Sequence, residues 1–158
     1  MKINFWEIPL ISVILGVISI ILPFWSRVQL GNLISVWPWG LIINTDYIQF
    51  HVGFLNNTSY LISGYLFTFL EVIAINILLI ITYRIWKNDI DVSNVRIFCL
   101  ISASILIISP ILLVIGGYFA ILEWSELYIP TLGFIIPFIS AFFAIIAAIL
   151  ASKYVKKI

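Results

Sequence analysis

The apolar residues of this chain come in four long runs, not at the intervals of an amphipathic helix. Each run is close to, or longer than, the roughly 20 residues that an α-helix needs to cross the hydrocarbon core of a bilayer. The pattern predicts four membrane-spanning helices, over residues 8–25, 61–83, 96–122 and 129–151. Between them lie a long loop of residues 26–60, a connection of residues 84–95 and a turn of residues 123–128.

A different pattern fills the loop of residues 26–60. Residues 47–54 alternate, with Ile48, Phe50, Val52 and Phe54 on one side, and this period of two predicts a half-buried strand. Two β-branched runs, residues 33–36 and 40–43, can form further strands, and turn residues follow the second of them. The sequence therefore predicts an all-α membrane protein, a four-transmembrane-helix bundle with a small antiparallel β-sheet in the first outer loop.

Composition agrees with this fold class. The 158 residues are 63% hydrophobic and 9% charged, with a mean hydropathy of +1.21, which lies outside the range of ordinary soluble domains. The net charge of +1 comes without a basic patch, so we expect the lipid bilayer as a partner and no nucleic acid. Because Cys99 is the only cysteine, no internal disulfide can form.

The basic residues predict the orientation of the chain. All but Arg27 fall on one side of the predicted helices: Lys2, Arg84, Lys87, Arg96, Lys153, Lys156 and Lys157. By the positive-inside rule, both termini and residues 84–95 are then cytoplasmic, and the long loop and the turn face outward. We expect an integral protein of the plasma or cytoplasmic membrane.

Glu71 is the sharpest candidate for chemistry, because it lies near the middle of the second predicted helix. A charged carboxylate at the bilayer centre costs roughly 2.5–3.5 kcal/mol on the insertion scale, so Glu71 should face the interior of the bundle. Thr68 shares its face one turn away and can reach it. Asn76 is rotated away from Glu71 and needs another partner, such as a serine of the third helix. The interpretations that stay open are a proton or cation relay, a binding site for a cation of a partner subunit, and a protonated side chain that holds helices together through hydrogen bonds.

Small residues recur at steps of three and four along the fourth predicted helix, and they predict a helix-packing face. These residues are Gly133, Pro137, Ala141, Ala144 and Ala148. Such a face can pack inside the bundle or form the seam of a homo-oligomer.

Two features of the loop suggest other sites. Asn56 and Asn57 begin overlapping N-glycosylation sequons. His51 is the only histidine, and a metal site needs three or four ligands, so we expect neither a metal nor another cofactor.

The loop also carries a partial motif, in which Trp25 is followed by the pair Gly40-Leu41. Together with four spans and a β-rich first outer loop, this motif resembles the claudin and peripheral-myelin-protein-like tetraspan families. Their first-loop signature is a tryptophan, then Gly-Leu-Trp, then a cysteine pair. Here Ile42 replaces the second tryptophan, Trp39 precedes the glycine, and the cysteine pair is absent. The resemblance implies cell-surface adhesion or a structural membrane role.

The expected function is therefore structural, adhesion-like or that of an accessory subunit, with other membrane proteins or a second copy as partners. The outer loop would be its recognition surface, with these candidate residues: Trp25, Trp37, Trp39, Gly40, Leu41 and His51. The alternative is a small proton- or ion-conducting, or ligand-binding, membrane module centred on Glu71. The sequence contains no nucleophile–base pair or ligand cluster, so we expect no enzyme.

Overall fold

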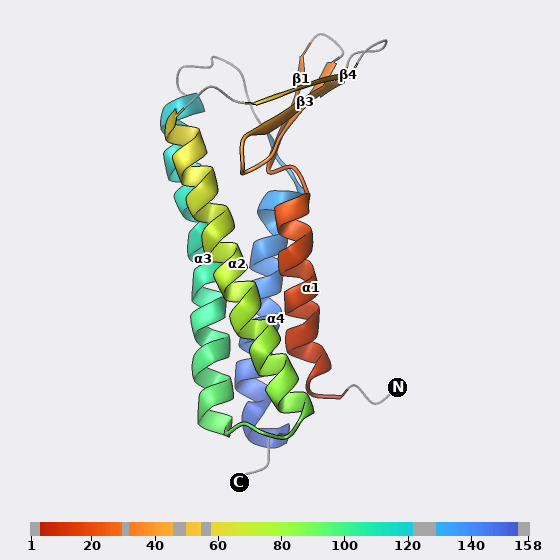
Figure 1. Ribbon diagram of the computed structural model, residues 1–158, viewed down its shortest axis with the longest axis vertical. Coiled ribbons are helices and arrows are strands. Elements are labelled where there is room, and N and C mark those ends of the chain that lie inside the picture. Colours follow the sequence, from red (N-terminus) through yellow and green to blue (C-terminus); the bar gives the residue numbers. More distant parts are fainter. Residues whose placement is uncertain (1–3, 30–31, 46–49, 55–57, 122–128, 155–158) are drawn as a thin grey trace.

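In the part of the chain that the structure describes, four helices pack side by side and carry a small β-sheet at one end (Figure 1). The computed structural model describes residues 4–29, 32–45, 50–54, 58–121 and 129–154. The helices are α1 (Glu7–Ile21), α2 (Thr58–Trp86), α3 (Val92–Ile121) and α4 (Leu132–Tyr154). α1 and α3 each pack against both α2 and α4, and the start of α1 and the end of α4 lie at the end opposite the sheet.

Long apolar helices are confirmed for α2, α3 and α4, which within the described residues are the three long and apolar enough to cross a membrane. α1 is apolar but only 15 residues long. Its expected end at residue 25 was wrong, because Leu22 is already extended, with φ −82° and ψ 151°. The residue before a proline avoids the helical region, and Pro23 follows. Trp25 begins a strand instead.

The other helix ends also differ from the apolar runs. α2 and α3 begin a few residues before residues 61 and 96, because polar side chains outside an apolar run can still continue a helix. α4 begins at Leu132 and not at residue 129, since Ile129–Pro130 forms a short strand, β5. The Thr131 hydroxyl, just before α4, donates a hydrogen bond to the Pro23 carbonyl and so joins this helix start to the segment after α1.

The predicted small antiparallel sheet is confirmed, but it has more strands than expected. Its order is β4-β3-β2-β1-β5, with β1 (Trp25–Gln29), β2 (Asn32–Val36), β3 (Leu41–Thr45) and β4 (Phe50–Phe54) from the first long connection. β5 comes from the connection between α3 and α4 and pairs with β1. Because β1 pairs with both β2 and β5, the two connections at this end of the bundle form one layer.

β4 is not half-buried as the alternation predicted. Val52 and Phe54 are 65% and 70% exposed, and His51 on the other side of the strand is exposed as well. The reason is its position at the edge of the sheet, farthest from β1. The apolar cluster under the sheet takes side chains from β1, β2 and β3, and the described part of β4 contributes none to it.

Candidate functional site

Glu71 lies at the centre of a polar group that joins three helices. It projects from α2 and is fully buried. Ser109 of α3 donates a hydrogen bond to Glu71 Oε1, and Ser19 Oγ of α1 lies 3.3 Å from Glu71 Oε2. Ser19 Oγ also lies 2.6 Å from the Gly16 carbonyl oxygen. We call Glu71, Ser19, Ser109 and the Gly16 carbonyl the Glu71 cluster.

The hydrogen bonds of this cluster indicate the protonation state of Glu71. A serine hydroxyl has one proton, and a carbonyl oxygen can only accept, so the short contact between Ser19 and Gly16 uses the Ser19 proton. The 3.3 Å contact between Ser19 Oγ and Glu71 Oε2 either shares this same proton, as the longer branch of a bifurcated hydrogen bond, or uses a proton carried by Glu71. A neutral Glu71 therefore satisfies every polar atom of the cluster, as buried groups require.

The two polar neighbours expected for this site do not join it. The Thr68 hydroxyl donates to the Gly64 carbonyl oxygen at 2.9 Å, one turn back on its own helix. Asn76 is exposed, and its Nδ2 donates to the Val72 carbonyl oxygen at 2.7 Å. The expected partner on the third helix was wrong for Asn76, because short polar side chains in a helix can bond the backbone four residues back.

A second polar contact closes the bundle between α1 and α4. Ser12 Oγ donates to the Ser140 carbonyl oxygen at 2.7 Å, and Ser140 Oγ donates to the Ser12 carbonyl oxygen at 2.8 Å. Both side chains are fully buried, so the two helix backbones must approach closely. This contact is reciprocal and uses both hydroxyl protons.

The small residues predicted to form a packing face on the last helix all lie inside the bundle. All five predicted residues are buried on α4: Gly133, Pro137, Ala141, Ala144 and Ala148. α4 packs against α1 and α3. The face is therefore occupied within one chain, and it is not available as a seam between copies unless the bundle opens.

Two tryptophans predicted for the recognition surface instead fasten the sheet to the bundle. Trp37 Nε1 donates to the Ile21 carbonyl oxygen at 2.7 Å, and Trp39 Nε1 donates to the Ile20 carbonyl oxygen at 3.4 Å. These carbonyls belong to the last turn of α1, where intrahelical donors run out. From α2, the Tyr60 hydroxyl donates to the Trp37 carbonyl oxygen at 3.2 Å.

The turn that carries these tryptophans depends on two glycines. Gly40 has φ +91°, a conformation that glycine adopts at little cost, and it leads into Leu41 at the start of β3. Gly64 on α2 lies directly under the Pro38 carbonyl, so that a Cβ atom there would overlap the carbonyl oxygen. Sheet and helix are thus in backbone contact at this point.

Aromatic packing completes the contact between the sheet and the bundle. Phe24 is fully buried and meets Phe67 and Phe134 edge-on, with ring centres 5.2 Å apart in both cases. Trp25 stacks on Phe134 with its ring centre 5.9 Å away. Of the predicted surface residues, Trp25 therefore belongs to the side of the sheet that faces the helices.

The opposite side of the sheet is apolar and exposed. Strand register places Val28 opposite Leu33, and it puts Val52 and Phe54 opposite Ile43 and Leu41. We call the exposed apolar residues of this side the outward sheet face: Val28, Leu33, Val52, Phe54 and Ile129. Their exposed fractions run from 45% to 74%. An exposed apolar patch of this kind is typical of an interaction site.

The remaining predicted sites are His51 and the two asparagines of the glycosylation sequons. His51 is exposed on β4, on the opposite side of the sheet from Val52, and within the described residues no group of three or more potential metal ligands occurs. Asn56 and Asn57, the predicted glycosylation sites, lie outside the described residues.

The chain matches no family model, no curated protein and no solved structure. The two features that stand out from its geometry are the Glu71 cluster and the outward sheet face.

Proposed function

We propose that this chain is an integral membrane protein with four spans and both termini in the cytoplasm. Supporting this, α2, α3 and α4 are long and apolar. α1 alone would cover about 22 Å of a roughly 30 Å hydrocarbon core. Non-helical backbone at membrane depth is tolerated where protein surrounds it, and the residue three positions beyond α1, Phe24, is fully buried.

The charges at the two ends of the bundle support the same orientation. Arg84, Lys87, Arg96 and Lys153 lie at the end opposite the sheet, in or beside the last turn of α2, the first turns of α3 and the last turn of α4. Arg27 lies in the sheet, on β1. By the positive-inside rule the sheet is then extracellular or periplasmic.

The proposed role is structural, adhesion-like or that of an accessory subunit, with the outward sheet face as the recognition surface. The observation that carries it is the exposure of Val52 and Phe54, at 65% and 70%, on a sheet that hydrogen bonds fix to the bundle. An apolar surface in water is costly, and a partner that covers it gains binding free energy. The partner would be another membrane protein or a second copy of this chain.

The resemblance to the claudin and peripheral-myelin-protein-like tetraspan families points in the same direction. Trp25 lies in β1, and Gly40 and Leu41 lie at the turn into β3 of the same sheet. A sheet built from both connections at one end of a four-helix bundle suits a protein that meets partners on that side.

Orientation is tested by labelling single cysteines from the two sides of a sealed membrane. With Cys99→Ala as background, Val28→Cys should react with an impermeant reagent only from outside, and Asp89→Cys only from inside. Labelling of both from one side would refute the four-span topology.

The recognition role is tested by exchanging neighbouring residues of β4. Val52→Lys places a charge on the outward sheet face, whereas His51→Lys places the same side chain on the other side of the same strand. In native membranes extracted with mild detergent, the first variant should lose bound protein partners and the second should keep them. Equal retention, or a wild-type chain that is always monomeric, would count against the recognition surface.

The second candidate function is a proton- or ion-conducting module, and the Glu71 cluster favours it in one respect. The cluster connects three helices through ionisable and hydroxyl groups inside the bundle. A relay must exchange the Glu71 proton, so Glu71→Gln should abolish proton flux in liposomes. A structural cluster should tolerate that change.

A further inference from the structure

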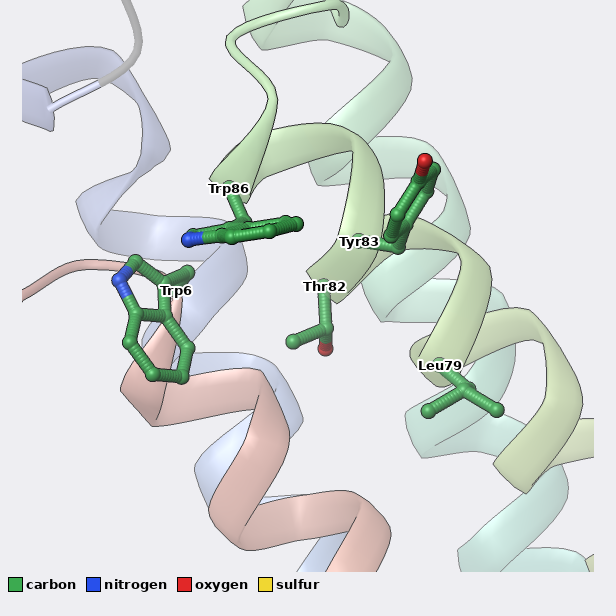
Figure 2. A pocket seen from close by; sticks show the side chains of 5 residues that line it. All are labelled: Trp6, Leu79, Thr82, Tyr83 and Trp86. Atoms are coloured by element: carbon green, nitrogen blue, oxygen red, sulfur yellow. The ribbon is translucent and has the colours of Figure 1, made fainter.

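A groove opens between α1 and α2 at the end of the bundle opposite the sheet. It has a volume of about 370 Å³ and is lined by Trp6, Leu79, Thr82, Tyr83 and Trp86. Figure 2 shows Trp6, at the start of α1, facing Trp86 near the end of α2, with Thr82 and Tyr83 one turn before Trp86 on α2 and Leu79 a further turn before them. The volume falls within the range of roughly 300–1,000 Å³ that small-molecule sites occupy.

The lining of the groove is suited to an apolar chain. Leu79, Tyr83 and Trp86 are each about half exposed, so apolar surface in the groove is uncovered. The Thr82 hydroxyl donates to the Leu78 carbonyl oxygen at 2.7 Å, so its proton is already used and its methyl group is the part left for packing. The ligand that fits such walls is hydrocarbon.

A cation, Lys87, lies beside two of the residues that line the groove. Lys87 Nζ lies 4.6 Å from the centre of the Trp86 ring and 6.0 Å from that of Tyr83, so the ammonium group rests on the two aromatic walls. The nearby Arg84, in the last turn of α2, has its Nη2 atom 3.7 Å from Asp89 Oδ2, so this second cation is paired with a carboxylate. A cation beside an apolar groove is complementary to a ligand with an anionic head and an apolar tail.

We propose that this groove binds one anionic phospholipid of the cytoplasmic leaflet, with an acyl chain between α1 and α2 and its phosphate beside Lys87. This proposal rests on the proposed membrane insertion and orientation, which place the groove at the cytoplasmic interface. Tryptophan, tyrosine and lysine are the residues that occupy that level, and anionic lipids are concentrated in that leaflet. Leu79, Tyr83 and Lys87 also fit a spacing suggested for cholesterol, so sterol is the competing occupant in the test.

The first experiment measures lipid binding to the purified, delipidated chain by native mass spectrometry. Phosphatidylglycerol, phosphatidylcholine and cholesterol are titrated separately. We expect phosphatidylglycerol to bind with a preference that Lys87→Gln lowers about fivefold, the effect of one basic residue near an anionic surface. Lys153→Gln removes the same charge from α4 at the same end of the bundle, outside the groove, and should leave the preference unchanged.

A second pair of variants tests the apolar part of the groove. Leu79→Trp should fill it and abolish the one-to-one complex, whereas Ile80→Trp, at an exposed neighbouring position outside the lining, should not. The proposal would be overturned by equal binding of phosphatidylglycerol and phosphatidylcholine, or by tighter binding of cholesterol. It would also be overturned if the two variants of either pair, the lysine pair or the tryptophan pair, had equal effects. Alkaline extraction of native membranes distinguishes failure of the lipid-site proposal from failure of the membrane proposal. A chain that resists extraction yet shows no lipid preference refutes the lipid site in the groove alone. A chain that alkali extracts refutes membrane insertion as well.

Discussion

Replacing Glu71 tests whether its cluster holds the bundle together or moves protons. Glu71→Gln keeps the shape of the side chain, and its amide can donate to Ser19 and accept from Ser109, as the neutral acid does. Glu71→Ala removes both hydrogen bonds and leaves a cavity at a fully buried position. The two variants therefore separate the loss of the proton from the loss of the side chain.

The expected magnitudes follow from those contacts. Hydrogen bonds between helices in membranes contribute about 0.6 kcal/mol on average and up to about 1.7 kcal/mol, so two of them contribute about 1–3 kcal/mol. Truncating a large buried side chain to alanine costs about 2–5 kcal/mol in all. We expect Glu71→Ala to lower the free energy of unfolding by about 3 kcal/mol and Glu71→Gln to lower it by less than about 1 kcal/mol.

The assay is reversible unfolding in mixed micelles, with an increasing fraction of denaturing detergent and far-ultraviolet circular dichroism as the signal. Val72→Ala is the control, because Val72 follows Glu71 on α2 but is 43% exposed, and it should change little. Equal costs for Gln and Ala would refute the reasoning, since they would show that the acid group itself is required. An infrared difference spectrum against Glu71→Gln should contain the carbonyl band of a protonated acid, and carboxylate bands would contradict the proton assignment.

Two further pairs of variants test contacts that support the same architecture. In the same assay, Ser109→Ala should lower the free energy of unfolding by about 1 kcal/mol, because it removes the hydrogen bond to Glu71. Ser102 is equally buried on α3, but its hydroxyl has no partner among the described residues. Ser102→Ala should therefore be neutral or stabilising. Gly64→Ala should lower the free energy of unfolding by about 1–3 kcal/mol, because its Cβ atom would meet the Pro38 carbonyl. Gly53→Ala is the control and should change stability little, because open space surrounds Gly53. A reversed order of costs in either pair would contradict these contacts.

Sequence reasoning found the elements that depend on local pattern. The apolar runs predicted the positions of the helices, and the β-branched runs predicted β2 and β3. The end of the first helix is also local, because Pro23 keeps Leu22 in the extended conformation. These features could be predicted because each is determined within a few residues of chain.

The parts that sequence reasoning missed depend on contacts between distant residues. β5 has two residues and no periodicity, and it exists because Ser26 pairs with Ile129. The partners of Glu71 lie 52 and 38 residues away on other helices, and nothing in the sequence connects them.

The described polar groups inside this molecule are largely occupied with one another, which limits how it can recognise a partner. Ser12 and Ser140 bond each other's backbone, and the Glu71 cluster uses its own protons. The indole N–H groups of Trp37 and Trp39 already donate hydrogen bonds to backbone carbonyl oxygens of α1. The outward sheet face and the groove beside α1 both offer mainly hydrocarbon and aromatic surface. Specificity at either surface must therefore come from shape and from a few charges at the rim, such as Lys87, and variants that alter shape should weaken binding more than those that remove hydrogen bonds.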